Sequence, residues 1–353
     1  METLIIFLII AQQIQMEKIL VIQTAFIGDA VLTLPMIQKL REGNPKSQID
    51  VVCISSTEEI FTSCPFVDNV LILDKRGKHK SISGLMKFGK KLKEHKYDKI
   101  YSPHRSLRTA FLVLLSEVRE TSGLSNSSLK YAYKKLVEYH LDKHEVQRNL
   151  DLIGYIYDDE SWKIKPVVKT TELITSKVND YLNFNNIREG FIAISPGSVW
   201  ATKRYPEEYF VQVIKFLVEE KKQVVLIGGE NDTEITSAIK NNFTEMVFDS
   251  AGGFSLIESI ELIRRSSLLI TNDSAPTHLG MCADIKVLTL YCSTVAGFGF
   301  YPYNNLSRYL SEDDLYCKPC GIHGFNECPI KTFECGFKLT PEKVIKTIKE
   351  MIN

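Results

Sequence analysis

Asp29 is a residue whose type and position could carry chemistry. It lies in the stretch TAFIGDAVLTLP, after an apolar run at residues 19–23 and before a helix-like segment. An aspartate in the first turn of a helix complements the positive end of the helix dipole, and this role is purely structural. A carboxylate at the carboxyl end of a parallel strand can instead act as an acid or a base, because open α/β sheets bind their ligands there. The stretch alone leaves both interpretations open.

The stretch ISPGSVWATKRYP predicts a site for a phosphate group. A strand is expected to end at Ser195, and the turn that follows, with Gly197 and Ser198, exposes backbone donors. Lys203 adds positive charge a few residues later. A polar turn next to a cation suits phosphate capture. A surface loop without a ligand is the alternative.

Two further strand ends carry polar residues. VVLIGGEND presents Glu230, which can accept hydrogen bonds from ribose hydroxyls, although any tight turn uses paired glycines. LLITNDSAPTHLGMCA ends a strand before Asp273, and Ser274 is the expected N-cap of a helix whose free N–H groups and dipole favour an anion. His278 lies one turn later on the same side of that helix. A packed side chain is the alternative to a ligand contact there.

The sequence lacks several nucleotide-binding motifs, and their absence disfavours some classes of protein. The sequence has no G-x-x-x-x-G-K-[ST] and no G-x-G-x-x-G after its first expected strand, which disfavours P-loop nucleotidases and nicotinamide dehydrogenases. It has no D-x-D, so a metal-bridged diphosphate is not indicated. Side-chain cations and helix dipoles would then have to stabilise a bound diphosphate.

Strand-like runs alternate with amphipathic runs in both halves of the chain. This pattern predicts an α/β protein with two doubly wound Rossmann-like domains that face a central cleft. The strands are expected at residues 19–23, 49–54, 69–73, 99–102, 191–195, 223–227, 246–248, 268–271 and 286–290. We expect a dispensable apolar leader at 1–15, domains at 16–168 and 186–337, a linker at 169–185, and a helix at 338–353 that packs back on the first domain.

Charge and composition limit the possible binding partners and the cellular compartment of the protein. The chain has 43 basic and 43 acidic residues, so no overall field indicates nucleic acid. Basic residues nevertheless crowd residues 75–99, which predicts contact with an anionic membrane surface, or else a solvated helix face. The apolar run in residues 1–15 is too short to span a bilayer and lacks the features of a secretory signal, so we expect a cytoplasmic protein.

Four cysteines form the pattern C-x2-C-x7-C-x6-C near the end of the chain, with His323 inside it. In the cytoplasm such thiols are expected to be reduced. Their clustering favours ligation of a structural zinc ion over disulfides, although the spacing is shorter than that of common zinc pairs. The four residues are Cys317, Cys320, Cys328 and Cys335.

Together the motifs IQTAFIGDAVLTLP, SPGSVWATKRYP, LIGGEND and NDSAPTHLG resemble those of the lipopolysaccharide heptosyltransferases of glycosyltransferase family 9, in order and spacing. The resemblance covers about residues 19–345. It implies a GT-B fold with the acceptor in the first domain and ADP-heptose, a donor substrate rather than a cofactor, in the second. It also implies an inverting, metal-independent transfer to the lipopolysaccharide inner core, by a protein peripheral at the inner face of the inner membrane.

The resemblance also implies a role for each motif residue. Asp29 would be the general base, and Gly28 would give the acceptor close access. Lys203 would contact the diphosphate, and Glu230 the ribose. The other donor-binding residues would be Ser195, Gly197, Ser198, Phe254 (on the base), Asp273, Ser274, Ala275 and His278.

The sequence departs from the family pattern in two places. SAPTH stands where Ser/Thr-Gly-Leu-x-His is commoner, and the turn STVAGFGFYP is also unusual. These departures leave the exact sugar open. A transferase that uses another nucleotide sugar for a cell-surface glycan is one alternative, and a non-catalytic nucleotide-sugar binding protein is another. A base in the domain opposite the donor disfavours the second alternative, because binding alone needs no base.

Overall fold

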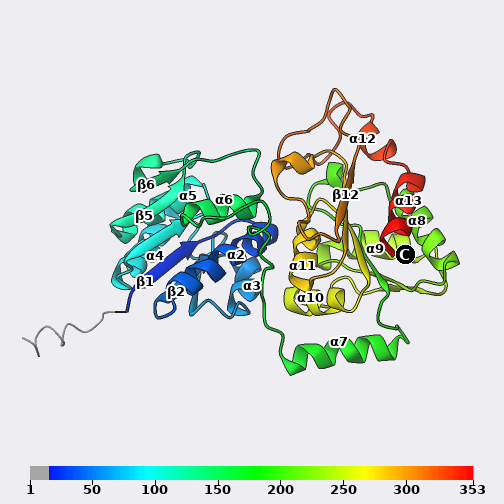
Figure 1. The fold of residues 1–353 in the computed structure, drawn as a ribbon, viewed down its shortest axis with the longest axis horizontal. Coiled ribbons are helices and arrows are strands. Elements are labelled where there is room, and N and C mark those ends of the chain that lie inside the picture. The colour runs from blue at the N-terminus through cyan, green and yellow to red at the C-terminus, as the bar shows by residue number, and fades with distance from the viewer. Residues whose placement is uncertain (1–15, 353) are drawn as a thin grey trace, which may run out of the picture.

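A computed structural model describes residues 16–352, which form two α/β lobes that lie side by side (Figure 1). The expected leader at residues 1–15 lies outside the described residues. Each lobe contains one six-stranded sheet in which all strands run parallel. The two sheets confirm the predicted α/β class and the two doubly wound halves.

The sheet of the first lobe has the strand order β3-β2-β1-β4-β5-β6. Its central strand β1 has the sequence KILVI and is buried almost throughout, as expected of a parallel strand covered on both faces. Its strands are β1 (Lys18–Ile22), β2 (Gln48–Cys53), β3 (Asn69–Ile72), β4 (Lys99–Ser102), β5 (Glu120–Leu124) and β6 (Lys135–Val137). The helices are α2 (Ile27–Gly43), α3 (Glu58–Thr62), α4 (Ile82–Glu94), α5 (Leu107–Ser116) and α6 (Glu145–Leu152).

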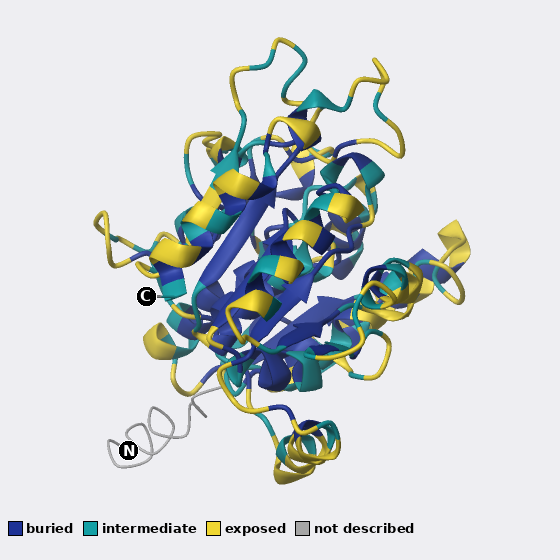
Figure 2. Cartoon of the chain, turned by 90° about the vertical axis from the view of Figure 1, so that its right-hand side faces the viewer, coloured by how far each residue is buried: buried dark blue, intermediate teal, exposed yellow. Residues whose placement is uncertain are grey.

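The second lobe repeats this plan with the strand order β12-β11-β10-β7-β8-β9. Its strands are β7 (Ile192–Ser195), β8 (Val224–Leu226), β9 (Val247–Asp249), β10 (Leu268–Asn272), β11 (Val287–Tyr291) and β12 (Arg308–Ser311). The helices are α8 (Glu207–Glu219), α9 (Thr233–Lys240), α10 (Leu256–Arg264), α11 (Ala275–Ala283), α12 (Glu334–Phe337) and α13 (Pro341–Ile352). In both lobes the central strands are buried, and exposed residues gather on the outer faces of the helices, in loops and on the edge strands β6 and β12 (Figure 2).

The two lobes share an apolar interface. Helix α2 of the first lobe packs against α11 of the second, and one cluster of buried side chains includes residues of both helices. A polar contact adds to this interface at the start of α10, where the Glu59 carboxylate accepts hydrogen bonds from the Ser255 hydroxyl at 2.5 Å and from the Leu256 backbone N–H at 2.9 Å. A carboxylate at a helix N-terminus satisfies free N–H groups and complements the helix dipole.

The C-terminal helix was expected to pack back on the first domain, and this prediction is wrong. Helix α13 packs against α8, and its Val344, Ile348 and Met351 join the core of the second lobe (Figure 1). The Lys286 ammonium also donates a hydrogen bond of 2.5 Å to the Met351 carbonyl. Amphipathic periodicity identifies the buried face of a helix but not the surface that buries it, so the sequence could not make this distinction.

The segment expected as a linker, residues 169–185, contains the helix α7 (Glu172–Phe184). This helix packs against α10 of the second lobe, and Lys177 pairs with Glu258 at 2.6 Å. Among the described helices, none combines the length and the apolar character needed to cross a membrane.

Candidate active site

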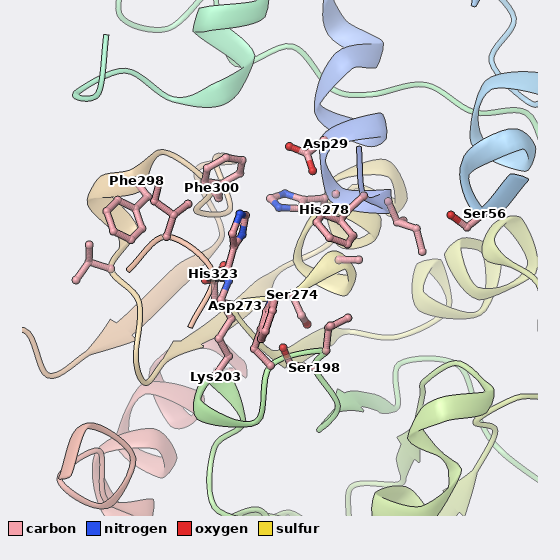
Figure 3. Close-up of a pocket in the computed structure, with 18 residues that line it drawn as sticks. Asp29, Ser56, Ser198, Lys203, Asp273, Ser274, His278, Phe298, Phe300 and His323 are labelled. Atoms are coloured by element: carbon pink, nitrogen blue, oxygen red, sulfur yellow. Dashed lines mark ion pairs between the residues drawn. The ribbon is translucent and has the colours of Figure 1, made fainter. Parts of the chain in front are cut away.

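A cavity of about 250 Å³ lies between the lobes, at the carboxyl ends of both sheets (Figure 3). Open α/β sheets bind ligands at this edge. The first lobe lines the cavity with Phe26, Ile27, Gly28, Asp29 and Ser56. The second lobe contributes Ser198, Val199, Trp200, Lys203, Asp273, Ser274, Ala275, His278, Val295, Phe298, Phe300, Ile322 and His323.

Asp29 is held at the cavity wall by the first turn of α2. The helix begins at Ile27, directly after the loop that follows β1, so the carboxylate lies at the carboxyl end of the central strand. Burial raises the pKa of Asp29, and contacts with the Phe26 backbone and the charge of Arg105 counteract part of this effect. A carboxylate with a raised pKa binds a proton more readily, which suits a general base.

Lys203 and Asp273 form an ion pair on the other side of the cavity, with 2.6 Å between Nζ and Oδ2. The same Asp273 oxygen accepts a hydrogen bond of 2.6 Å from the Thr294 hydroxyl. Lys203 ends a 3-10 turn, Ala201–Lys203. Asn272 fixes this turn against β10, because its side chain accepts from the Tyr205 N–H at 2.9 Å and donates to the Pro196 carbonyl at 2.7 Å. The cation is therefore held at the end of the second sheet.

Helix α11 begins at this cavity, with Ser274 at the N-cap position and Pro276 in the first turn, as the sequence predicts. The Ser274 side chain makes no capping hydrogen bond, however. Its hydroxyl lies 3.4 Å from the Asn272 carbonyl oxygen instead. The first turn thus retains N–H groups that its own cap residue leaves unsatisfied, and such a terminus suits an anion.

His278 reaches the cavity from α11 and packs against the first lobe. A Cβ built on Gly28 would lie 2.8 Å from His278 Cδ2, which is closer than real Cβ contacts allow. The resemblance implied that Gly28 gives an acceptor close access, and the structure adds that Gly28 makes room for this imidazole. Burial lowers the pKa of His278 to about 4, so the ring is neutral near pH 7.

Four of the predicted donor-binding residues do not line this cavity. Ser195 is buried at the end of β7, and Gly197 lies against the Asp232 carboxylate. Glu230 is exposed after β8, and Phe254 packs edge-on against Tyr181 with 5.2 Å between ring centroids. Glu230 and Phe254 still lie on neighbouring loops, since Gly252 approaches the Cα atom of Glu230.

The cavity also contains aromatic residues that sequence reasoning did not assign. Phe298 and Phe300 come from the unusual turn after β11, so the departure from the family pattern was the signal that could have revealed them. Trp200 lies in the Lys203 stretch itself. His323 comes from the cysteine-rich segment, whose spacing gives no indication that it reaches the cavity.

The four clustered cysteines line a second cavity of about 300 Å³, together with Phe325 and Phe333. Desolvation acts to raise the pKa of the Cys328 thiol, but the backbone N–H groups of residues 330–333 together outweigh it and lower this pKa, and the Phe333 N–H lies 3.4 Å from the Cys328 Sγ. Burial raises the pKa of Cys335 to about 11. No three His, Cys, Asp or Glu side chains within residues 16–352 are arranged to hold a metal ion.

Sequence comparison connects the chain to known proteins. The sequence profile described as glycosyltransferase family 9 (heptosyltransferase) matches residues 85–327. Lipooligosaccharide heptosyltransferase 2 of Campylobacter jejuni is 24% identical over 340 residues, which are 95% of this chain and 99% of that protein. Lipopolysaccharide heptosyltransferase 2 of Escherichia coli is 23% identical and aligns over 78% of this chain and 82% of its own length.

Solved structures agree with the observed fold. A family 9 glycosyl transferase from Veillonella parvula superposes with a TM-score of 0.82 at 23% identity, and the match covers 95% of this chain and 97% of that one. The ADP-heptose lipopolysaccharide heptosyltransferase II of Escherichia coli superposes with a TM-score of 0.75 at 21% identity, over 95% and 98% of the two chains. The two-lobed architecture is therefore the GT-B fold of these enzymes.

Proposed function

Because the chain belongs to glycosyltransferase family 9, we propose that it transfers heptose from ADP-heptose to a sugar of the lipopolysaccharide inner core. One observation carries this proposal. A carboxylate of the first lobe, Asp29, and a cation next to a helix start in the second lobe, Lys203 and Ser274, line the same cavity. A base and an anion site on opposite walls are what the transfer of a glycosyl group from a nucleotide diphosphate requires.

The donor would place its diphosphate between Lys203 and the first turn of α11. As the bond from the sugar to the diphosphate breaks, negative charge grows on the departing ADP. The ammonium group and the N–H groups of the helix start therefore stabilise the transition state more than the ground state. Because side-chain cations and helix dipoles of the protein would stabilise the negative charge on the departing ADP, we propose that the transfer needs no metal ion.

The acceptor would enter from the first lobe, where Asp29 takes the proton of the attacking hydroxyl. Attack from the side opposite the departing diphosphate inverts the configuration at the anomeric carbon. Glu230 and Phe254 would bind the ribose and the base of the donor, outside the cavity that contains the reacting groups. General-base catalysis of this type typically contributes about 100- to 10,000-fold.

A donor screen tests the proposal. ADP-heptose and other nucleotide sugars are incubated with the protein, with and without a core lipid acceptor, and nucleotide release is measured. We expect release that depends on both ADP-heptose and acceptor, and an inverted anomeric configuration in the product by NMR. Turnover with another nucleotide sugar alone would indicate a different glycan, and binding without turnover would indicate a binding protein.

A basic surface on the first lobe supports membrane attachment at the inner face of the inner membrane. Lys87, Lys90 and Lys91 are exposed on α4, and the apolar side chains of Ile82 and Met86 are also exposed there, at 74% and 52%. Positive charge with exposed apolar side chains suits an anionic lipid surface. Replacing the three lysines with Gln should weaken binding to anionic vesicles, and replacing Lys215, Lys221 and Lys222 of the second lobe should not.

The cysteine-lined cavity is a candidate site for a structural metal ion. Four thiols around one cavity match the number of ligands that structural zinc takes, although they would have to move together to bind it. Elemental analysis of the purified protein tests this part of the proposal. We expect one zinc ion per chain, which is lost when Cys328 is replaced by Ser. A metal-free protein with four titratable thiols in this segment would contradict it.

A further inference from the structure

The side chains that line the cavity offer little net positive charge to a diphosphate. Lys203 is the one permanent cation among the described lining residues, and it is already paired with Asp273 at 2.6 Å. Asp29 adds a second negative charge to the lining. The charged side chains of the lining therefore sum to a negative charge, and the other positive contributions are the start of α11 and Arg105, whose charge acts on Asp29 and His323.

Two histidines line the cavity, and they differ in the protons they can take. His278 is buried, with 4% of its surface exposed, and its pKa of about 4 keeps it neutral near pH 7. His323 is exposed at the mouth of the cavity, where its imidazole points inward (Figure 3). A nearby anion favours the protonated form of an exposed imidazole, so His323 is the histidine of this cavity that can respond to a bound anion.

The position of His323 is coupled to that of Lys203. The turn that carries Lys203 is joined to the cysteine-rich segment through Thr202, whose N–H donates to the Phe325 carbonyl at 3.0 Å and whose hydroxyl accepts from the Phe325 N–H at 2.8 Å. Gly324 has φ +80°, and a Cβ there would lie 2.9 Å from the Thr202 hydroxyl. The chain thus crosses directly over the Lys203 turn, and His323 and Lys203 line the same cavity.

Aromatic rings flank the imidazole of His323. The ring of Trp200 lies nearly parallel to that of His323, at 6.3 Å between centroids, and Phe26 of the first lobe lies edge-on at 6.3 Å. Neither ring can neutralise a phosphate. The side of the imidazole that faces the cavity remains available for a ligand.

We propose that His323 binds the diphosphate of the donor as a second cation next to Lys203, and that it stabilises the departing ADP. This inference rests on the proposed function. Without ligand, partial burial and the charges of Lys203 and Arg105 lower the pKa of His323, while Asp273 acts in the opposite direction. Asp29 and the neutral His278 complete the titratable groups that line the cavity. A diphosphate raises the pKa of His323, so binding is coupled to uptake of a proton.

The test is calorimetric titration with ADP alone at pH 6.5 to 8, in buffers that differ in their enthalpy of ionisation. The proteins are the parent, His323→Gln, which cannot be protonated, and His140→Gln, an exposed histidine of the first lobe. We expect His323→Gln to bind ADP about tenfold more weakly at the low end of this range, since a hydrogen bond to a charged group is lost. It should also take up fewer protons than the parent, whereas His140→Gln should match the parent in both respects.

Subtracting the variant from the parent removes the protons that ADP itself exchanges. If His323→Gln binds ADP with the parent's affinity and proton uptake, the inference is wrong while the proposed function stands. If the parent does not bind ADP at all, both are wrong. Circular dichroism of His323→Gln checks the fold, which an exposed side chain should not affect.

Discussion

His278 of α11 lies against Gly28 of α2, so closely that no Cβ fits between them. We predict that Gly28→Ala displaces the buried imidazole or pushes the lobes apart. Overpacking of this type costs about 1–3 kcal/mol of stability. Because Asp29 follows Gly28 in the chain, either movement shifts Asp29 relative to the second lobe and should lower kcat at least tenfold. Thermal unfolding and steady-state kinetics measure the two effects.

Gly43→Ala is the matched control for that substitution. Gly43 lies at the end of the same helix, and a Cβ there would meet no atom within 4 Å. Alanine should be neutral or slightly stabilising at this position, because glycine costs more backbone entropy in a helix. If the two alanine variants behave alike, close packing is not the reason for glycine at residue 28.

The second prediction concerns the effect of Lys203 on donor affinity and turnover. Lys203→Ala removes the cation next to the diphosphate site and leaves Asp273 without its partner. Donor affinity should fall about 10- to 100-fold, because a hydrogen bond to a charged group contributes about 1.5–3 kcal/mol. Turnover should fall as well, since negative charge grows on the departing group. Calorimetry with ADP and kinetics at saturating donor separate the two effects.

Lys215→Ala provides the control for a change of charge alone. Lys215 is exposed on α8, away from the cavity between the lobes. Its replacement should change neither ADP affinity nor turnover. Equal losses in both variants would mean that overall charge, and not the position of Lys203, governs donor binding.

The third prediction concerns stability and pH. Burial raises the pKa of Asp29 in the folded protein, so the folded state binds this proton more tightly than the unfolded state does. The stability contributed by the protonated carboxyl is complete below the ordinary value of 3.8 and is lost as pH rises through the raised pKa. Asparagine does not ionise, so Asp29→Asn does not lose this stability as pH rises. The variant should therefore unfold at a higher temperature than the parent at pH 7.

The difference in stability should narrow as pH falls and should be smallest below 3.8, where the parent carboxyl is protonated in both the folded and the unfolded state. Thermal unfolding of both proteins between pH 3 and pH 7 or so gives the difference in melting temperature as a function of pH. A lower melting temperature of Asp29→Asn at pH 7 would show that the ionised carboxylate stabilises the fold, and that it is a helix-start residue.

Most strands of the two sheets were predicted from sequence, including the edge strands β3 and β9, whereas β5, β6 and β12 were not. Strands β1 and β10 were located to within a residue at either end, because their apolar runs are bounded by polar turns. Strand β5 reads ETSGL and β12 reads RYLS, with no apolar run or strict alternation. These strands form through pairing with neighbours, and that tertiary context is not encoded in local periodicity.

The candidate site was predictable where its residues follow a strand. Asp29, Lys203, Asp273 and Ser274 each lie just after a strand in one of the two sheets, and the structure brings them to one cavity. The reason for Gly28 depends on a contact across the lobes, and His323 reaches the cavity through a long segment without helices or strands. Neither of these contacts follows from the periodicity of the sequence, so the sequence could not predict them.

The most direct test of the central claim compares Asp29→Asn with the parent in turnover and in donor affinity. The asparagine keeps the size of the side chain but cannot take the proton of the acceptor hydroxyl. If Asp29 is the general base, turnover at saturating acceptor should fall about 100- to 10,000-fold while ADP-heptose affinity stays within a factor of two or so. If Asp29→Asn folds and turns over at the parent rate, Asp29 is not the base.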